Sequence, residues 1–178
     1  PVDVPRARAA LDALGEGARA AVARVGGDEA RPPEARIVRR VEAVARYLRD
    51  EAGFHGNADD YYDPRNSYLD EVLRRGVGLP ITLSVAAMEI GRRVGASVVG
   101  VGVPSHFLVR DAQHDVYGDP FHEGAVMDRA ALVAEVGDVD DVLVLEQVGR
   151  LRLADEALEH ALGAVGPGAQ HLHCRDLA

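Results

Sequence analysis

A histidine and an aspartate lie on two consecutive strand-like segments of this chain. His106 begins the segment 106–110, and Asp119 ends the segment 116–119. An imidazole oriented by a carboxylate is two thirds of the machinery of cysteine-type acyl transfer, because the carboxylate fixes the imidazole tautomer and the imidazole activates a thiol. The third group would be a thiolate at a helix N-terminus, where the helix dipole lowers its pKa.

The helix expected to present that nucleophile contains no cysteine. It begins at Pro80, which suits a first helical turn, and continues with Ile81. Thr82 and Ser84 carry hydroxyls, but we interpret Thr82 as a partner of backbone donors and Ser84 as a small packing residue. The one cysteine, Cys174, would have to fold back over the cleft, an option that stays open because triad order varies along the chain.

A hairpin would bring the histidine and the aspartate together. If its turn pairs Arg110 with Asp115, His106 lies directly opposite Asp119 and both side chains share a face of the sheet. A slip of one residue would place them on opposite faces. Two interpretations remain open: a functional dyad, or a hydrogen-bonded pair that only holds the hairpin.

Helical periodicity precedes these strands. It predicts an N-terminal helix over 6–25, a second helix from Pro33 to Gly53, and a third over 80–94 that carries few charges and is expected to be the central, buried helix. Ser67 is predicted to open a short helix through a capping box. Alternation then predicts strands over 97–103, 106–110 and 116–119.

Helices followed by an antiparallel sheet indicate an α+β fold. Farther on, Asp128 is expected to cap a helix through Val136, and 142–145 fits either a strand or the start of a helix. We predict a single domain over 1–178, with a core at about 33–125, a C-terminal helical extension over 126–163 and a mobile tail over 164–178.

Composition excludes several classes of function. The 178 residues carry a net charge of −9, which argues against nucleic acid as a partner. All 20 basic residues are arginine, so Schiff-base chemistry on a lysine is excluded. A single cysteine excludes an intrachain disulfide. No apolar run approaches the ~20 residues of a membrane span, and we expect a cytoplasmic protein with no membrane partner.

Several ordered blocks of this sequence resemble the transglutaminase-like core of the SirB-type proteins, which is also found in some F-box proteins. The resemblance runs roughly from Arg36 to Gly124 and rests on residues 54–57, 61–69, 72–73, 78–84, 104–110 and 119–121. It implies the papain-like fold, in which a central helix packs on a small antiparallel sheet, with extra helices here at both ends of the chain.

The resemblance also implies residue roles. His106 matches the family's histidine, Asp119 its aspartate, and Pro80 or Ile81 the place where true transglutaminases carry cysteine. This branch commonly lacks the cysteine. Ser105 departs from the glycine that is usual before the histidine, and residues 122–124 are a looser match.

Polar and aromatic residues before the central helix are candidates for ligand binding. They are Asn57, Tyr61, Tyr62, Asn66 and Ser67, to which Thr82 is added. The aspartates of the same loop, such as Asp63, lack the spacing of an EF-hand and are better explained by turns and caps.

We predict no metal site and no cofactor. His55, His114 and His122 have no partner at metal-ligand spacing. His171, His173 and Cys174 lie close together near the C-terminus, where an incidental tail is the favoured interpretation and adventitious metal binding the alternative.

The sequence therefore predicts a transglutaminase-like protein without the catalytic cysteine. The favoured function is a binding or regulatory pseudoenzyme whose cleft takes a peptide or small molecule, or serves a protein partner. The alternative is an enzyme of amide or ester hydrolysis, acyl transfer or cyclisation, in which His106, oriented by Asp119, acts as a general base.

Overall fold

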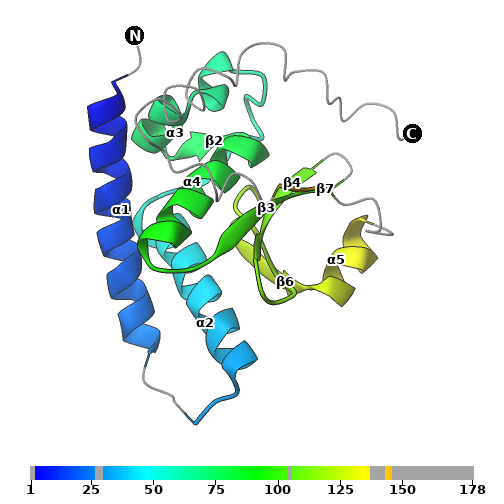
Figure 1. Cartoon of the computed structure of the whole chain (residues 1–178). Helices are drawn as coiled ribbons and strands as arrows, with labels where there is room; N and C mark the ends of the chain where they lie inside the picture. Colours follow the sequence, from blue (N-terminus) through cyan, green and yellow to red (C-terminus); the bar gives the residue numbers. More distant parts are fainter. Residues whose placement is uncertain (1–2, 27–29, 104–105, 137–142, 146–178) are drawn as a thin grey trace.

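The computed structural model describes residues 3–26, 30–103, 106–136 and 143–145, and it has the predicted α+β character (Figure 1). Its α-helices are α1 (Val4–Val25), α2 (Pro33–Arg46), α3 (Leu69–Arg75), α4 (Pro80–Arg93) and α5 (Arg129–Val136). A π-helical turn (Tyr47–Glu51) extends α2, and a 3₁₀ turn (Pro64–Ser67) precedes α3.

One antiparallel sheet of five strands forms the other half of the fold. Its order is β6-β5-β4-β3-β7, built from β3 (Val98–Val103), β4 (His106–Asp111), β5 (Val116–Asp119), β6 (Ala125–Asp128) and β7 (Leu143–Leu145). A separate parallel pair joins β1 (His55–Gly56) to β2 (Val77–Gly78). The segment 142–145, which fitted either a strand or a helix start, thus contains an edge strand.

Helix α4 is the buried centre of the molecule, as predicted. It lies between α1 and the sheet, in contact with β3 and β4 (Figure 1). Its apolar residues Leu83, Ala86 and Ile90 are almost fully buried. Burial of a side chain as large as that of leucine or isoleucine stabilises the folded state by about 1.5–3 kcal/mol. Pro80 fixes the first turn, and the chain leaves the helix before Gly95, whose φ of 78° favours glycine.

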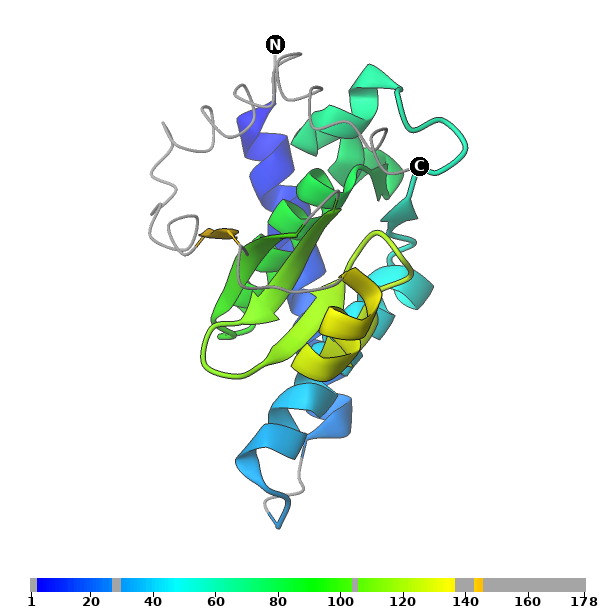
Figure 2. The same ribbon diagram turned by 90° about the vertical axis from the view of Figure 1, so that its right-hand side faces the viewer.

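The sheet is covered on both faces. One face contributes Val109 to the core that contains α4, whereas Val101, Leu108 and Tyr117 pack with Leu132 of α5 on the other. Figure 2 looks from the side of α5, with α1 behind the sheet. The layers are therefore helices, sheet and a short helix.

The predicted register of the hairpin is wrong by two residues. Arg110 pairs with Tyr117, and Val109 with Gly118, rather than Arg110 with Asp115. The turn is longer than expected because the Asp111 carboxylate accepts hydrogen bonds from the backbone of Gln113 and the ring of His114, which holds this segment out of the ladder. A shift of two preserves the side-chain faces.

The N-terminal helices agree with prediction to within a few residues. Asp3 caps α1 by accepting from the Arg6 N–H at 3.0 Å, and α2 begins at Pro33. The capping box at Ser67 is wrong: Ser67 ends the 3₁₀ turn, and Tyr68, the N-cap of α3, makes no capping bond within the described part of the chain.

The C-terminal predictions have a mixed outcome. Asp128 caps α5 by accepting from the Ala131 N–H at 2.8 Å, as expected, but β6 was not foreseen as a strand. Most of the predicted extension over 126–163 and the whole tail over 164–178 lie outside the described residues.

Candidate functional site

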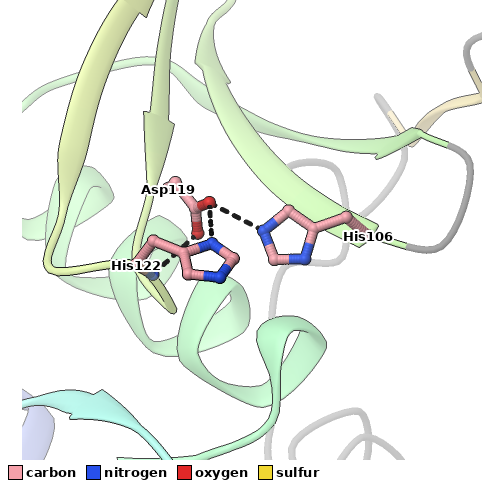
Figure 3. A group of neighbouring side chains, drawn as sticks. All are labelled: His106, Asp119 and His122. Carbon is pink, nitrogen blue, oxygen red and sulfur yellow. Dashed lines mark hydrogen bonds and ion pairs between the residues drawn. The ribbon is translucent and has the colours of Figure 1, made fainter. Parts of the chain in front are cut away.

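His106 and Asp119 meet at the end of the hairpin away from its turn. The His106 Nε2 lies 2.8 Å from the Asp119 Oδ2 (Figure 3). In the observed register, continued from Val109 and Gly118, Asp119 lies diagonally rather than directly across from His106. The Asp119 side chain is 2% exposed and the His106 side chain 17%, so the carboxylate is buried beneath a ring that solvent reaches.

The Asp119 carboxylate is saturated with donors. Its Oδ1 accepts from the backbone N–H groups of Phe121 (2.9 Å) and His122 (3.1 Å). Its Oδ2 faces the His106 Nε2 and, at 2.7 Å, the His122 Nδ1. An ionised carboxylate only accepts, so both facing ring nitrogens donate protons, and a neutral His106 keeps its Nδ1 lone pair free.

These contacts set the charge of the carboxyl group. Burial by itself would raise the pKa of Asp119, but the hydrogen bonds from His106 and His122 outweigh burial and lower the pKa from 3.8 to about 2. Asp119 is therefore an anion at neutral pH, and a fixed negative charge stabilises any positive charge that develops on the rings beside it.

The sequence did not predict the part played by His122. A tight turn after Asp119 carries this ring back over the carboxylate, with Glu123 at a φ of 56° and Gly124 at 66°. The Arg49 guanidinium donates to the Glu123 carbonyl at 3.1 Å and holds the turn. His122 is 62% exposed. The three-residue spacing from Asp119 was the available signal, but it becomes contact only when the turn closes.

The start of α4 lies beside β4. The Ser84 hydroxyl, buried in the second turn, donates to the Phe107 carbonyl at 3.3 Å, one residue after His106. Ile81, one turn earlier on the same side of the helix, is 37% exposed, and Pro80 is buried. Among the described residues this end of the helix offers no thiol, and Cys174 lies outside them.

Thr82 is engaged in the fold rather than directed at solvent. Its buried hydroxyl accepts from the Leu79 N–H at 3.0 Å and donates to the Asn66 carbonyl at 2.8 Å. This is the backbone role expected for Thr82, and it also ties the loop before α3 to the first turn of α4.

The side-chain amides of two asparagines hold the predicted binding loop in its conformation. Asn66 is fully buried and donates through Nδ2 to the carbonyls of Asp60 and Tyr61, while its Oδ1 accepts from Asn57 at 3.0 Å. Asn57 and Asn66 thus shape the loop from within. Ser67 is half-buried at the end of the 3₁₀ turn.

The buried aspartate of this loop, Asp63, is already paired with two arginines. The Asp63 carboxylate forms ion pairs with Arg65 at 2.7 Å and Arg75 at 3.3 Å. The hydrogen bond from Arg65 lowers the pKa of Asp63. This pairing favours the cap and turn interpretation over a calcium site.

Aromatic side chains form a wall next to the dyad. The Phe121 ring centroid lies 6.0 Å from that of His106 and 6.1 Å from that of Tyr61, which in turn contacts Tyr62. Phe121 rests on Gly56, where a Cβ would lie 2.6 Å from the ring, so only glycine fits there. Tyr61 is therefore close to the site, while Tyr62 is 78% exposed at its margin.

A cavity of about 470 Å³ lies apart from these aromatic residues. It is lined mainly by apolar residues of α2, α4 and the sheet, such as Val41, Val44 and Ala87, and it reaches Asp119 without including His106 or Tyr61. Sequence periodicity did not predict it, because it depends on how far α2 stands from the sheet.

A helix packed on an antiparallel sheet, with a His–Asp pair at the sheet's end, is what the sequence predicted for a transglutaminase-like protein. The family model of the transglutaminase-like superfamily matches residues 5–141, and the chain belongs to that superfamily.

Curated relatives are similar over part of their length. A UPF0162 protein of Xylella fastidiosa (strain 9a5c) is 43% identical over 116 residues, which are 61% of this chain and 41% of that protein. A UPF0162 protein of Vibrio cholerae is 32% identical over 98 residues, 53% of this chain and 36% of that one. The chain thus spans about two fifths of these relatives.

Mouse F-box only protein 21 is 38% identical over 73 residues, covering 41% of this chain and 12% of that protein. No solved structure gives a significant match. Among the described residues, no helix combines the length and the apolar character that a bilayer crossing requires.

Proposed function

We propose that this chain is a non-covalent binding or regulatory protein, a pseudoenzyme of the transglutaminase-like superfamily that uses the cleft beside His106 and Asp119. The observation that carries the proposal is the pairing of an intact His–Asp dyad with a helix start at Pro80 and Ile81, neither of which is a nucleophile. Among the described residues this helix start offers no thiol, and the Thr82 and Ser84 hydroxyls are bound to backbone carbonyls, so the site has the means to bind a carbonyl or amide but not to form an acyl-enzyme.

The proposed ligand is a peptide or small molecule with an apolar part. Tyr61 and Phe121 offer ring faces and edges beside the dyad, and aromatic rings bind apolar groups with little loss of side-chain freedom. His106 supplies a hydrogen-bonding nitrogen at the end of that wall. A protein partner that presents an extended segment would satisfy the same requirements.

One observation favours an enzymatic alternative. The Nε2 of His106 is bound to Asp119, which leaves the Nδ1 as the acceptor of a neutral ring, the arrangement of an oriented general base. Such a base supplies a rate gain of about 10²–10⁴, enough for an activated or intramolecular acyl substrate. Hydrolysis, acyl transfer or cyclisation would then proceed without a covalent intermediate.

Replacement of His106 separates the two functions. We expect His106→Ala to leave the hydrolysis of p-nitrophenyl acetate and of N-acetylglutamine amide at the wild-type level, with His114→Ala as the control histidine variant. Turnover that is lost in a folded His106→Ala protein, and kept in His114→Ala, would contradict the binding proposal and establish the general-base alternative.

Binding is tested with N-acetyl dipeptide amides that carry aromatic or aliphatic side chains. Titrations followed by ¹H–¹⁵N NMR are expected to shift the amide signals of residues 106–108, Asp119, Phe121 and His122 in the wild type. These shifts are expected to be smaller in Tyr61→Ala. Tyr68→Ala is the matched control, because Tyr68 is exposed to a similar degree. Signals that stay unmoved throughout the set would count against a peptide ligand.

The place of the missing cysteine can be probed directly. In a Cys174→Ser background, a thiol introduced by Ile81→Cys is expected to react with iodoacetamide faster than free cysteine, because the helix N-terminus and the nearby imidazole lower its pKa. Pro80→Cys, at a buried position, is the paired variant. Ordinary reactivity of Ile81→Cys that His106→Ala leaves unchanged would show that Ile81 does not face the dyad.

A further inference from the structure

We propose that His106, Asp119 and His122 form a binding site for a divalent transition-metal ion, with Zn²⁺ as the best match. One ligand atom from each of the three residues lies within 4.8 Å of the other two. Figure 3 shows both rings directed at the same carboxylate oxygen. This inference goes beyond the proposed binding function and does not depend on it.

The set of donors selects the kind of ion. Two imidazole nitrogens and one carboxylate oxygen suit zinc and related transition metals, whereas calcium and magnesium need mostly oxygen ligands. Three protein ligands leave a coordination position free, which is the pattern of zinc sites that bind a further molecule rather than of closed structural sites.

The charge of the site favours a cation. Asp119 is buried, and two ring N–H groups, from His106 and His122, converge on its Oδ2 at 2.8 and 2.7 Å. A single ion at that point would take the place of the two N–H protons and neutralise the carboxylate, and in each neutral ring the displaced proton would move to the other ring nitrogen. The two rings would bind as neutral imidazoles, so binding releases protons wherever the rings are charged.

The two ring-to-carboxylate spacings require only a small adjustment, and the two ring nitrogens lie within 4.8 Å of each other. Atoms bound at 2.0–2.2 Å from one zinc ion lie about 3.0–3.5 Å apart, slightly more than the two hydrogen-bond distances above. His122 is on an exposed turn and can move outward. Asp119 stays in place because the backbone N–H groups of Phe121 and His122 hold its other oxygen, as an outer shell does in known metal sites.

The same hairpin supplies a matched control. His114 Nδ1 contacts Asp111 Oδ1 at 2.8 Å with the same three-residue spacing as His122 and Asp119. Within the part of the chain that the structure describes, this second pair is not joined by a third ligand. This pair therefore offers the same types of donor as the proposed site, an imidazole and a carboxylate, but only two ligands instead of three.

The test is calorimetric titration of the metal-free 178-residue chain with ZnCl₂, with Co²⁺ absorption spectra as a report on geometry. Three potential ligands of the C-terminal region are first replaced in all proteins, by His171→Gln, His173→Gln and Cys174→Ser. In that background we expect one Zn²⁺ per chain. We expect His122→Ala and Asp119→Asn to weaken binding by at least about 10- to 100-fold, the loss that even outer-shell changes produce.

The controls decide how a negative result is interpreted. His114→Ala is expected to bind as the background protein does, and circular dichroism confirms that each variant is folded. Zinc affinity that is equal in the background, His122→Ala and Asp119→Asn proteins would overturn the site, as would no binding at micromolar Zn²⁺. Peptide binding by a chain that binds no zinc would leave the proposed function standing and remove only this inference.

Discussion

The β4–β5 hairpin carries two aspartate–histidine pairs of the same local design. At its closed end Asp111 binds His114, and beyond its open end Asp119 binds His122, in each case three residues apart and with ring-to-carboxylate distances of 2.8 and 2.7 Å. Each aspartate also accepts from a backbone N–H that follows it. By local sequence the two pairs are nearly equivalent.

Their surroundings differ. The Asp119 side chain is 2% exposed and receives a second imidazole from His106 on the neighbouring strand, whereas the side chain of Asp111, the last residue of β4, is 13% exposed. Burial removes water as a competing donor, so the protein must supply every partner of Asp119. The three-residue spacing is enough to pair an aspartate with a histidine. A candidate functional site also requires the burial of Asp119 and the second ring, which His106 contributes from the neighbouring strand.

Removal of each carboxylate should give the largest contrast. Asp119→Ala leaves two backbone N–H groups and the His106 ring without their acceptor, and we expect it to destabilise the fold by about 2–4 kcal/mol in urea unfolding. Asp111→Ala should cost about 1 kcal/mol, because water replaces the lost acceptor. Equal losses would show that burial does not distinguish the pairs.

The next largest expected effect is a dependence of stability on pH that comes from Asp119. The lowered pKa of Asp119, about 2 instead of 3.8, means that the folded state favours its ionised form. Since one pKa unit corresponds to about 1.4 kcal/mol, this contribution to stability is about 2 kcal/mol. It is complete above about pH 5 and is lost as the pH falls from about 4 to about 2.

That loss is measured as the difference between wild type and Asp119→Asn in unfolding free energy at a series of pH values. The difference should shrink toward low pH. A constant gap between wild type and Asp119→Asn over pH 5 to 2 would contradict the role given to the carboxylate.

A smaller effect is expected from the exposed ring. His122→Ala removes one of the two imidazole hydrogen bonds to Asp119, so the pKa of Asp119 should rise toward its usual value in an NMR titration of the carboxyl carbon. Stability should fall by only about 0.5–1 kcal/mol, because the ring is mostly in solvent. An unchanged pKa would assign the lowering to His106 alone.

The smallest effect is expected at the closed end. His114→Ala should change the unfolding free energy by less than about 0.5 kcal/mol, since the Asp111 carboxylate that it leaves behind is 13% exposed and water replaces the lost donor, although the His114 ring at 23% is less exposed than the His122 ring at 62%. Thermal unfolding in parallel with His122→Ala measures it. A larger loss for His114→Ala than for His122→Ala would reverse the comparison.

Local signals in the sequence determined much of the fold. Pro80, followed by the apolar period of Leu83, Ala87 and Ile90, predicted α4 and its burial, because helix start and amphipathic face are set within a few residues. Strand alternation, which also has a local cause, put His106 and Asp119 on one face. The two-residue error in register left that face unchanged, because side chains alternate with a period of two.

Tertiary structure alone decided the rest. His122 reaches Asp119 in a turn in which the backbone N–H groups of Phe121 and His122 donate to the Asp119 carboxylate, a conformation that spacing does not reveal. Asn66 serves the fold because the buried Thr82 hydroxyl donates to its carbonyl from a different element. The types of the reactive groups are thus fixed by the chain, whereas their partners, burial and charge depend on contacts between residues distant in sequence.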